Sequence, residues 1–262
     1  MNNDIYLTEF YHKCDEDGRL LTRYGAIEFI TTMKYIEKYL QKRMKIIEIG
    51  AATGRYSHTL ARMGYEVDAV ELLEHNIDIF RKNTSIGEKI SITQANAMDL
   101  SSFKDEKYDI TLLLGPMYHL YTEEDKLKAL SEAIRVTKKG GIVFAAYCMG
   151  DASVLQYGFG RGIIKELIEK CMLNPETFDT FSNPWDIFEL HRKEDIDQLR
   201  SHFDVEQLHF IATDGYSNHI REKLDEMDED TYEIYIKYHL ATCERQDLIG
   251  YSNHTLDIFK KN

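Results

Sequence analysis

Residues 46–54 read Ile46-Ile47-Glu48-Ile49-Gly50-Ala51-Ala52-Thr53-Gly54, and this stretch decides the fold. An apolar run typical of a β-strand ends in small residues, and a helix-like sequence begins at Arg55. A strand, a tight turn of small residues and a helix form the opening unit of a nucleotide-type α/β fold. Glycine suits such a turn because it tolerates positive φ and lets a ligand lie against bare backbone.

A second apolar run, at 66–70, ends in Glu71. Glu71 follows Gly50 by about 20 residues, where a doubly wound fold places an acid against ribose hydroxyls. The glycine turn alone would also fit an ordinary strand–helix connection. The turn and the acid together are more specific, and they predict a nucleoside-type ligand.

The opening stretch resembles motif I of the class I S-adenosylmethionine-dependent methyltransferases, written E-x-G-x-G-x-G. Glu48, Gly50 and Gly54 match this motif, and Ala52 replaces its middle glycine. In dinucleotide-binding folds the second glycine admits the pyrophosphate, so Ala52 disfavours a cofactor that carries phosphate. The resemblance implies S-adenosyl-L-methionine as cofactor and S-adenosyl-L-homocysteine as its product.

Composition limits the class of protein. The chain has 262 residues, of which 43% are hydrophobic, enough for one packed α/β domain with additions. We expect neither a membrane span nor a secretory signal, because long apolar runs are lacking and the N-terminal residues are polar. Four scattered cysteines favour free thiols in a reducing cytoplasm. Ten histidines show no ligand spacing, so we expect no metal site.

The net charge of −13 is unevenly spread. Residues 1–150 carry a net charge of −2, and residues 151–262 carry −11. Because an acidic surface repels a phosphate backbone, we expect a small-molecule acceptor rather than nucleic acid, and no membrane partner. The acidity by itself favours solubility more than a cationic substrate. We expect a monomer or a homodimer.

The hydrophobic periodicity predicts alternating helices and strands. Helices are predicted at 24–41, 55–63, 74–83, 123–136 and 193–202, and strands at 45–49, 66–70, 90–94, 108–114, 142–147, 205–212 and 254–260. We divide the chain into an N-terminal helical cap (1–41), a cofactor-binding core (42–150) and a remainder (151–262) with helical lid inserts at about 151–203 and 216–249. The resemblance implies a three-layer, doubly wound α/β sheet of seven mostly parallel strands, the last of which returns antiparallel.

Two further segments follow predicted strands. Residues 96–100 resemble the family's D-A-x-D-L segment, which holds the adenine edge, although Asn96 stands where aspartate is usual. The carbonyl oxygen of Asn96 can still accept from an amino group. Residues 115–120 follow the apolar strand at 108–114, where ligands of open α/β sheets bind. They lack the [DNS]-P-P-[FYW] signature of amino-group methylating nucleic-acid and glutamine enzymes.

These motifs define a set of candidate site residues. For the cofactor we expect Arg19, Glu48, Gly50, Ala51, Ala52, Gly54, Tyr56, Glu71, Leu72, Asn96, Ala97, Met98, Leu114 and Gly115. His119 is the candidate catalytic base, since an unperturbed imidazole titrates near neutrality, and Tyr118 is the alternate. Packing beneath a lid, or a contact with cofactor backbone, is the competing explanation for His119. For the substrate we expect Tyr11, Tyr147, Phe159, Arg161, Trp185, Tyr216, His219 and His239, each of which fits lid packing too.

The predicted reaction is an in-line displacement that moves the methyl group from the sulfonium to an O or N acceptor. Such a reaction needs mainly the alignment of donor and acceptor. Three alternatives stay open: a non-catalytic protein that binds S-adenosylmethionine or S-adenosylhomocysteine, a nicotinamide-dependent oxidoreductase, and a nucleic-acid methyltransferase.

Overall fold

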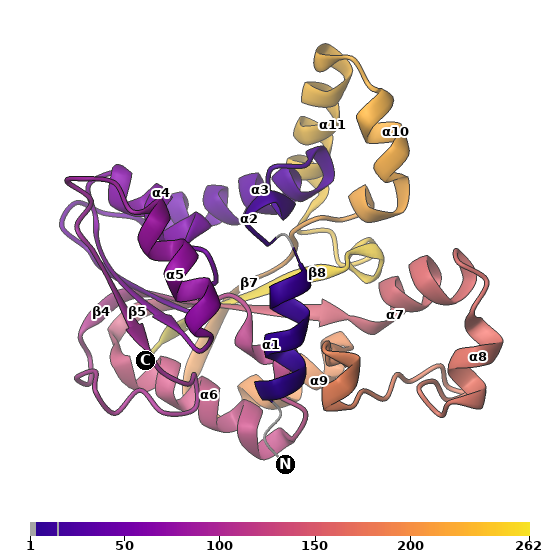
Figure 1. The fold of residues 1–262 in the computed structure, drawn as a ribbon, viewed down its shortest axis with the longest axis horizontal. Coiled ribbons are helices and arrows are strands. Elements are labelled where there is room, and N and C mark those ends of the chain that lie inside the picture. The colour runs from indigo at the N-terminus through magenta and orange to yellow at the C-terminus, as the bar shows by residue number, and fades with distance from the viewer. Residues whose placement is uncertain (1–3, 15) are drawn as a thin grey trace.

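One twisted sheet organises the computed structural model, which describes residues 4–14 and 16–262 (Figure 1). Its strand order is β3-β2-β1-β4-β5-β8-β7, and the short β6 pairs with β5. The strands are β1 (Lys45–Ile49), β2 (Glu66–Glu71), β3 (Ile90–Gln94), β4 (Tyr108–Leu113), β5 (Thr137–Met149), β6 (Leu190–His191), β7 (Val205–Ala212) and β8 (His254–Lys261). The order reverses between β1 and β4, which makes their carboxyl ends the place where such folds bind ligands.

Helices cover both faces of this sheet (Figure 1). The helices α3 (Arg23–Tyr39), α4 (Arg55–Arg62) and α5 (Glu74–Asn83) lie on one face, and α6 (Glu123–Val136) and α9 (Lys193–Ser201) lie on the other. A separate apolar cluster fills each interface. The central strands are buried on both sides, which explains why their sequences are continuous apolar runs rather than alternating ones.

Local sequence explains where these elements begin. Ile46, Ile47 and Ile49 of β1 are fully buried, and each side chain of this size contributes about 1.5–3 kcal/mol of hydrophobic free energy. Thr22 and Thr122 precede α3 and α6, and each hydroxyl accepts from a backbone amide in the first turn. Such caps satisfy amides that lack a partner inside the helix.

The α/β class and the doubly wound sheet are confirmed. The antiparallel returning strand is confirmed too, because β8 pairs antiparallel with both β5 and β7. The start of β5 was predicted at residue 142, whereas the structure places it at Thr137. Thr137 already pairs with Tyr108 across an irregular register, so 138–141 belong to the strand.

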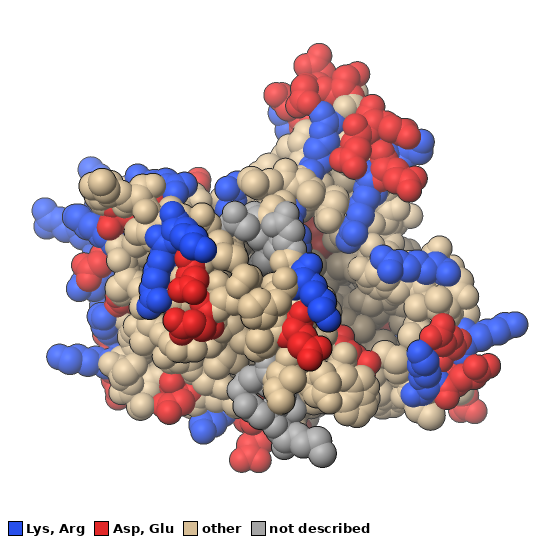
Figure 2. Space-filling view, in the orientation of Figure 1, with Lys and Arg blue, Asp and Glu red and all other residues tan. Residues whose placement is uncertain are grey.

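Two inserts extend from the carboxyl edge of the sheet (Figure 1). The first contains α7 (Gly150–Ser153), η2 (Val154–Phe159), α8 (Ile164–Glu169) and η3 (Pro184–Asp186). The second contains η4 (Ser217–Ile220), α10 (Arg221–Glu226), α11 (Glu229–Thr242) and η5 (Ile249–Tyr251). The α10–α11 pair projects from the body as a lobe, and Figure 2 shows acidic side chains gathered at its tip.

The N-terminal helices close over the same edge. The chain begins with α1 (Asp4–Lys13) and α2 (Glu16–Arg19), and η1 (Pro116–His119) follows β4. The helix α1 contacts α5 on one side and η3 on the other. Among the residues described, no helix combines the length and the apolar character needed to cross a bilayer.

Candidate functional site

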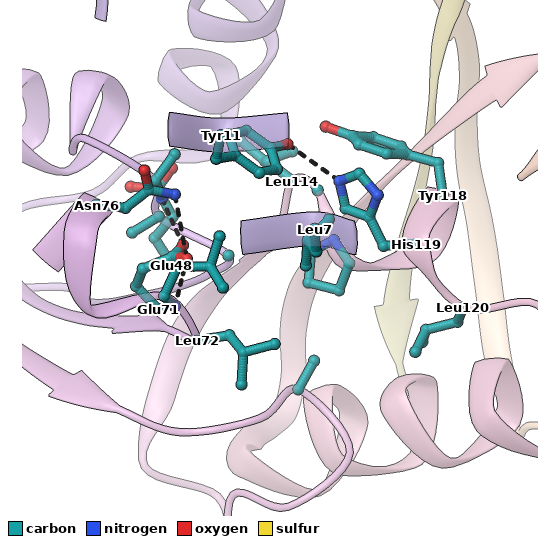
Figure 3. A pocket seen from close by; sticks show the side chains of 18 of the residues that line it. Leu7, Tyr11, Glu48, Glu71, Leu72, Asn76, Leu114, Tyr118, His119 and Leu120 are labelled. Carbon is teal, nitrogen blue, oxygen red and sulfur yellow. Dashed lines mark hydrogen bonds between the residues drawn. The ribbon is translucent and has the colours of Figure 1, made fainter. Parts of the chain in front are cut away.

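A cavity of about 370 Å³ lies beyond the carboxyl ends of β1, β2 and β4 (Figure 3). Its walls come from the turn after β1, the end of β2, the segment after β3, the segment after β4, and the N-terminal helices. Lining residues include Leu7, Tyr11, Arg19, Glu48, Gly50, Ala51, Ala52, Tyr56, Glu71, Leu72, Asn76, Asn96, Ala97, Met98, Leu114, Gly115, Tyr118 and His119. The motifs found in the sequence therefore meet around one space.

The glycine turn is fixed by backbone contacts. The amides of Gly50 and Ala51 donate to the Val70 carbonyl at 2.8 and 2.9 Å, and φ of Gly50 is +78°. A Cβ on Gly50 would lie 2.6 Å from Pro116, so glycine is needed where the turn and η1 meet. Gly54 does not line the cavity, because its α-carbon packs against Phe80 of α5. The structure thus gives Gly54 a packing role instead of a cofactor contact.

Glu71 ties the end of β2 to the glycine turn. Its carboxylate accepts from the amides of Ala52 at 2.8 Å and Leu73 at 3.0 Å, and from Nδ2 of Asn76 at 3.3 Å. Burial raises the pKa of Glu71 despite these hydrogen bonds. Glu71 also lines the cavity, so a ligand hydroxyl bound there would lie beside its carboxylate.

Glu48 is a buried acid in the wall of the cavity. Its Oε2 accepts from the Ser57 amide at 2.9 Å and from the Ser57 hydroxyl, which joins β1 to the first turns of α4. Burial raises the pKa of Glu48 to about 8. Glu48 is therefore mostly a neutral acid at pH 7, able to donate as well as accept a hydrogen bond.

The segment after β3 forms a tight turn at the cavity wall. Oδ1 of Asn96 accepts from the Met98 amide at 2.9 Å. One lone pair of this oxygen is still available to an adenine amino group. Ala97 is buried beside it, so the segment presents a small apolar surface and a polar edge.

His119 is held at both of its ring nitrogens, and Figure 3 shows its contact with Tyr11. Nδ1 lies 2.9 Å from the Ile187 carbonyl and therefore carries the proton, and Nε2 accepts from the Tyr11 hydroxyl at 3.0 Å. Burial lowers the pKa of His119 to about 4. The nitrogen that would accept a proton is occupied and weakly basic, which argues against His119 as the base. Burial also raises the pKa of Tyr118 well above its usual value.

A second cavity of about 530 Å³ adjoins the first. Its lining is mainly apolar and comes from α1, the first insert and the segment before β6. The apolar members are Phe10, Val154, Tyr157, Ile163, Leu167, Met172, Leu173, Phe181, Phe188 and Leu190. Five residues line both cavities and form what we call the shared wall: Tyr11, Arg19, Glu28, Tyr118 and His254.

The shared wall holds a partly buried network of charges. Arg19 donates to both carboxylate oxygens of Glu28, at 2.6 and 3.3 Å. Nδ1 of His254 lies 2.7 Å from Oδ2 of Asp214 and 3.6 Å from Glu28. Burial opposes the charged form of His254, but Glu28 and Asp214 outweigh it and hold its pKa well above the usual value. Burial also opposes ionisation of Asp214, yet His254 keeps the pKa of Asp214 below its usual value.

The same cluster has the spacing of a metal site. Ligand atoms of Glu28, Asp214 and His254 lie within 4.8 Å of one another. Arg19 already occupies both oxygens of Glu28, and its guanidinium would repel a metal ion at close range. A proton is the cation that suits this cluster best.

The structure separates the sequence-derived candidates. Every residue expected to bind cofactor lines the first cavity except Gly54, and Tyr11 lines both cavities. Within the described part of the chain, seven substrate candidates line neither cavity: Tyr147, Phe159, Arg161, Trp185, Tyr216, His219 and His239. The geometry does not support them as substrate contacts.

These seven side chains either pack and bond elsewhere in the fold or are exposed to solvent. Tyr147 is buried against His191, and Arg161 covers the ring of Tyr157. The side chains of Phe159 and Trp185 are 55% and 60% exposed. The remaining three belong to the lobe and its base: Tyr216 stacks on His219, His219 bonds the Tyr251 carbonyl, and His239 bonds the Thr213 carbonyl.

Sequence reasoning missed Glu28, Asp214 and His254. Glu28 sits on α3, where it reads as part of a charged helix face, and Asp214 and His254 flank the second insert. Asp214 and His254 are 40 residues apart in sequence and form no local motif. The sequence could have indicated them only through the resemblance, because in such folds the residues that follow strand ends near the switch point bind ligands.

Comparison with known proteins supports the resemblance to methyltransferases that the sequence motifs indicated. A methyltransferase domain family matches residues 47–145. The chain is 28% identical over 140 residues to a demethylmenaquinone methyltransferase of Clavibacter sepedonicus, covering 52% of this chain and 55% of that protein. It is 29% identical over 134 residues to a ubiquinone biosynthesis O-methyltransferase of Hydrogenovibrio crunogenus, covering 50% and 53%. The chain spans about half the length of the curated relatives that it matches.

A solved structure supports the fold. An S-adenosylmethionine-dependent methyltransferase from Methanosarcina mazei superposes with a TM-score of 0.57 and 18% identity, covering 87% of this chain and 96% of that one. At that identity the superposition establishes the shared architecture and not a shared substrate.

Proposed function

The chain belongs to the class I S-adenosylmethionine-dependent methyltransferases, and from this premise we propose that it methylates a small molecule bound in the second cavity. S-adenosyl-L-methionine is the cofactor that family and fold imply. The finer proposal concerns this chain's own acceptor, an O or N atom of a small molecule.

The observation that carries the proposal is the pair of cavities with a shared wall. The first cavity offers donor-binding groups: the glycine turn for the methionine end, Glu71 for the ribose hydroxyls, and 96–98 for the adenine. The second offers about 530 Å³ of mainly apolar space, within the usual range for a small-molecule site. The two cavities adjoin at the shared wall, so a donor methyl group there would lie next to an acceptor in the second cavity.

The chemistry needs little more than this arrangement. The sulfonium is a good leaving group, so the reaction is an in-line displacement by the acceptor. Alignment of two bound reactants can lower the barrier by roughly 7–11 kcal/mol. The apolar walls keep water from the reacting atoms, which strengthens electrostatic interactions there.

Two further observations favour a small acceptor over nucleic acid. The curated relatives named above are methyltransferases of ubiquinone biosynthesis and of demethylmenaquinone. The net charge of −13 also opposes binding to a phosphate backbone.

Radiolabelled methyl transfer from S-adenosylmethionine to a metabolite panel tests the proposal. We expect label in at least one small molecule, and we expect Glu71→Ala to abolish it. Glu74→Gln is the matched control, because Glu74 is an exposed acid on the neighbouring helix α5. Tight donor binding without transfer across the panel would instead identify a non-catalytic donor-binding protein.

A further inference from the structure

His254 belongs to the shared wall, and one of its two ring nitrogens makes no hydrogen bond to the described residues. Its Nδ1 faces Asp214, so Nε2 lies on the opposite edge of the imidazole. Across the residues that the structure describes, Nε2 has no hydrogen-bond partner, and His254 lines both cavities. This nitrogen differs from Nε2 of His119, which the Tyr11 hydroxyl occupies.

Asp214 is itself firmly held. Its Oδ1 accepts from the Ser252 hydroxyl at 2.6 Å and from the His254 amide at 3.2 Å, and its Oδ2 accepts from Asn218 at 2.5 Å. A buried carboxylate in this position fixes the tautomer with the proton on Nδ1 and stabilises the imidazolium that forms on Nε2. Asp214 is thus a positioning residue for His254.

We propose that His254, oriented by Asp214, accepts the proton of a neutral hydroxyl on an apolar acceptor as that oxygen takes the methyl group. This inference rests on the proposed function, since it assigns the acceptor class and the base of the same site.

The step balances in atoms and charge. A lone pair of the acceptor oxygen forms the new O–C bond, and the S–C bond breaks with its electron pair going to sulfur. The O–H bond breaks at the same time, and its proton moves to Nε2 of His254. The sulfonium becomes a neutral thioether and His254 becomes an imidazolium, which later releases its proton to solvent.

Charge in the shared wall favours a neutral acceptor. With His254 neutral, Arg19 balances Glu28, and Asp214 is left with one negative charge. The incoming sulfonium supplies the compensating positive charge. A neutral hydroxyl keeps this balance. Asp186 and Arg221 also line the second cavity and are opposite in sign, so a protonated amine there would add a charge without a compensating partner.

Asn253 supplies a second recognition point in the same cavity. The Asn218 carbonyl accepts from Nε2 of Gln156 at 3.2 Å, so Oε1 of Gln156 must accept from Nδ2 of Asn253, at 2.8 Å. This relay leaves Oδ1 of Asn253 buried without a partner among the described residues, on a side chain that is 7% exposed. A ligand donor there would satisfy it, which points to an acceptor with a second hydroxyl or N–H.

The pH dependence follows from the groups around His254. Facing it are Asp214 beyond β7, Glu28 of α3, Cys148 of β5, Arg19 of α2 and Tyr118 of η1. Burial lowers the pKa of His254, but Glu28, Cys148 and Asp214 together raise it well above the usual value. The resting side chain is therefore mainly the imidazolium at neutral pH, and the base form increases as the pH rises and when the sulfonium binds nearby. Turnover should therefore rise with pH through this titration.

Nitrogen NMR of histidine-labelled protein tests the base without a known acceptor. We compare the complex with S-adenosylhomocysteine, which is neutral at sulfur, and the complex with sinefungin, which carries an ammonium in place of the sulfonium. A nearby cation disfavours the imidazolium, so sinefungin should move the His254 midpoint to lower pH by about 0.5 or more. His254→Asn identifies the signal, and an identical midpoint in both complexes would overturn the proposal.

Methyl transfer to 2,3-dihydroxynaphthalene and to 2-naphthylamine tests the acceptor class. We expect transfer to the diol and not to the amine, and we expect His254→Asn to lower kcat by about 10²- to 10⁴-fold while changing donor affinity far less. His219→Asn, outside both cavities, is the matched histidine control. Transfer to the amine alone, to neither compound, or at an undiminished rate in His254→Asn overturns the inference.

Asp214→Asn and Asn253→Leu separate positioning from recognition. Asp214→Asn should shift the pH–rate profile to lower pH, because it removes a carboxylate that raises the pKa of His254. Asn253→Leu should raise KM for the diol with little change in kcat.

Loss of activity by chelation with EDTA would contradict a proton-based mechanism. If S-adenosylhomocysteine does not bind the wild type, the proposed function itself fails; if it binds and His254 does not respond, the inference alone fails.

Discussion

Glu48 shows how one residue links the fold to the site. It stands on β1 at the start of the glycine turn, it is buried, and it reaches both α4 and the donor cavity. An ionised acid in that place would lose its hydration without a compensating cation, so the neutral acid is favoured. Glu48, the acid that opens the sequence motif, therefore carries a proton at neutral pH.

The raised pKa of Glu48 predicts a pH-dependent stability. In the folded protein this pKa is about 8, against 4.5 for the exposed group, so the native state keeps a proton that the unfolded chain has lost. This contribution is fully present below pH 4.5 and is lost as the pH rises through 8. Relative to Glu48→Gln, the wild type should lose up to about 1.4 kcal/mol of unfolding free energy per pH unit within this window.

Urea denaturation of both proteins at pH 5, 6.5 and 8 measures this difference. A constant difference between them would show that Glu48 is ionised throughout. The exposed Glu74→Gln variant should follow the wild type at each pH.

The contact between Tyr11 and His119 makes a second prediction at this scale. Because both ring nitrogens of His119 are bonded, Tyr11→Phe and His119→Ala should each weaken binding of S-adenosylhomocysteine by a similar factor. A double-mutant cycle should give a coupling free energy of about 0.5–1.5 kcal/mol. If His119→Ala instead lowers turnover far more than donor affinity, His119 is a base after all.

At the scale of elements, α1 acts as a cover on the donor cavity. Leu7 and Tyr11 face the cavity, Phe10 packs edge-on against Phe188 with ring centres 5.4 Å apart, and His12 lies over His75 of α5. Tyr11 also bonds His119, and Tyr6 packs against Trp185. We therefore expect donor exchange to require α1 to separate from α5 and η3.

Removing residues 1–14 should speed the release of S-adenosylhomocysteine by about tenfold or more, because the apolar cover is lost. Stopped-flow fluorescence gives the rate, and far-ultraviolet circular dichroism shows whether the sheet is retained. Ile5→Ala is the control, because Ile5 of α1 is 60% exposed. An unchanged rate would show that α1 does not cover the bound donor.

At the scale of the whole molecule, the charge distribution sets the class of partner. Acidic side chains gather at the tip of the α10–α11 lobe (Figure 2). We predict no binding of a fluorescein-labelled 20-base single-stranded DNA or RNA at about 150 mM salt, because the Debye length of about 8 Å does not fully screen nearby charges. Anisotropy titration measures this, and submicromolar binding would restore a nucleic-acid acceptor.

The sequence predicts the donor side of the molecule well for a physical reason. The residues around Gly50, Glu71 and Asn96 follow successive strands, and parallel strands bring their carboxyl ends to one edge. Local order along the chain therefore becomes proximity in space. The positions of α5, β3, α6 and β7 follow in the same way from local periodicity.

The acceptor side could not be predicted in this way. The shared wall joins Arg19 and Glu28 to His254, and Asp214 supports it, so its parts come from both ends of the chain. Exposed aromatics such as Trp185 resembled substrate contacts, but only tertiary packing decides which ring faces a cavity. An isolated acid on a helix reads as a solvent contact until the fold buries it.

The measurement that tests the central claim most directly is a calorimetric titration of the wild type with S-adenosylhomocysteine and, separately, with NAD. Our account predicts a saturable heat with S-adenosylhomocysteine that Glu71→Ala abolishes, and no saturable heat with NAD, whose pyrophosphate finds Ala52 at the position of the second glycine. Micromolar binding of NAD with no response to S-adenosylhomocysteine would contradict the donor site and the account built on it.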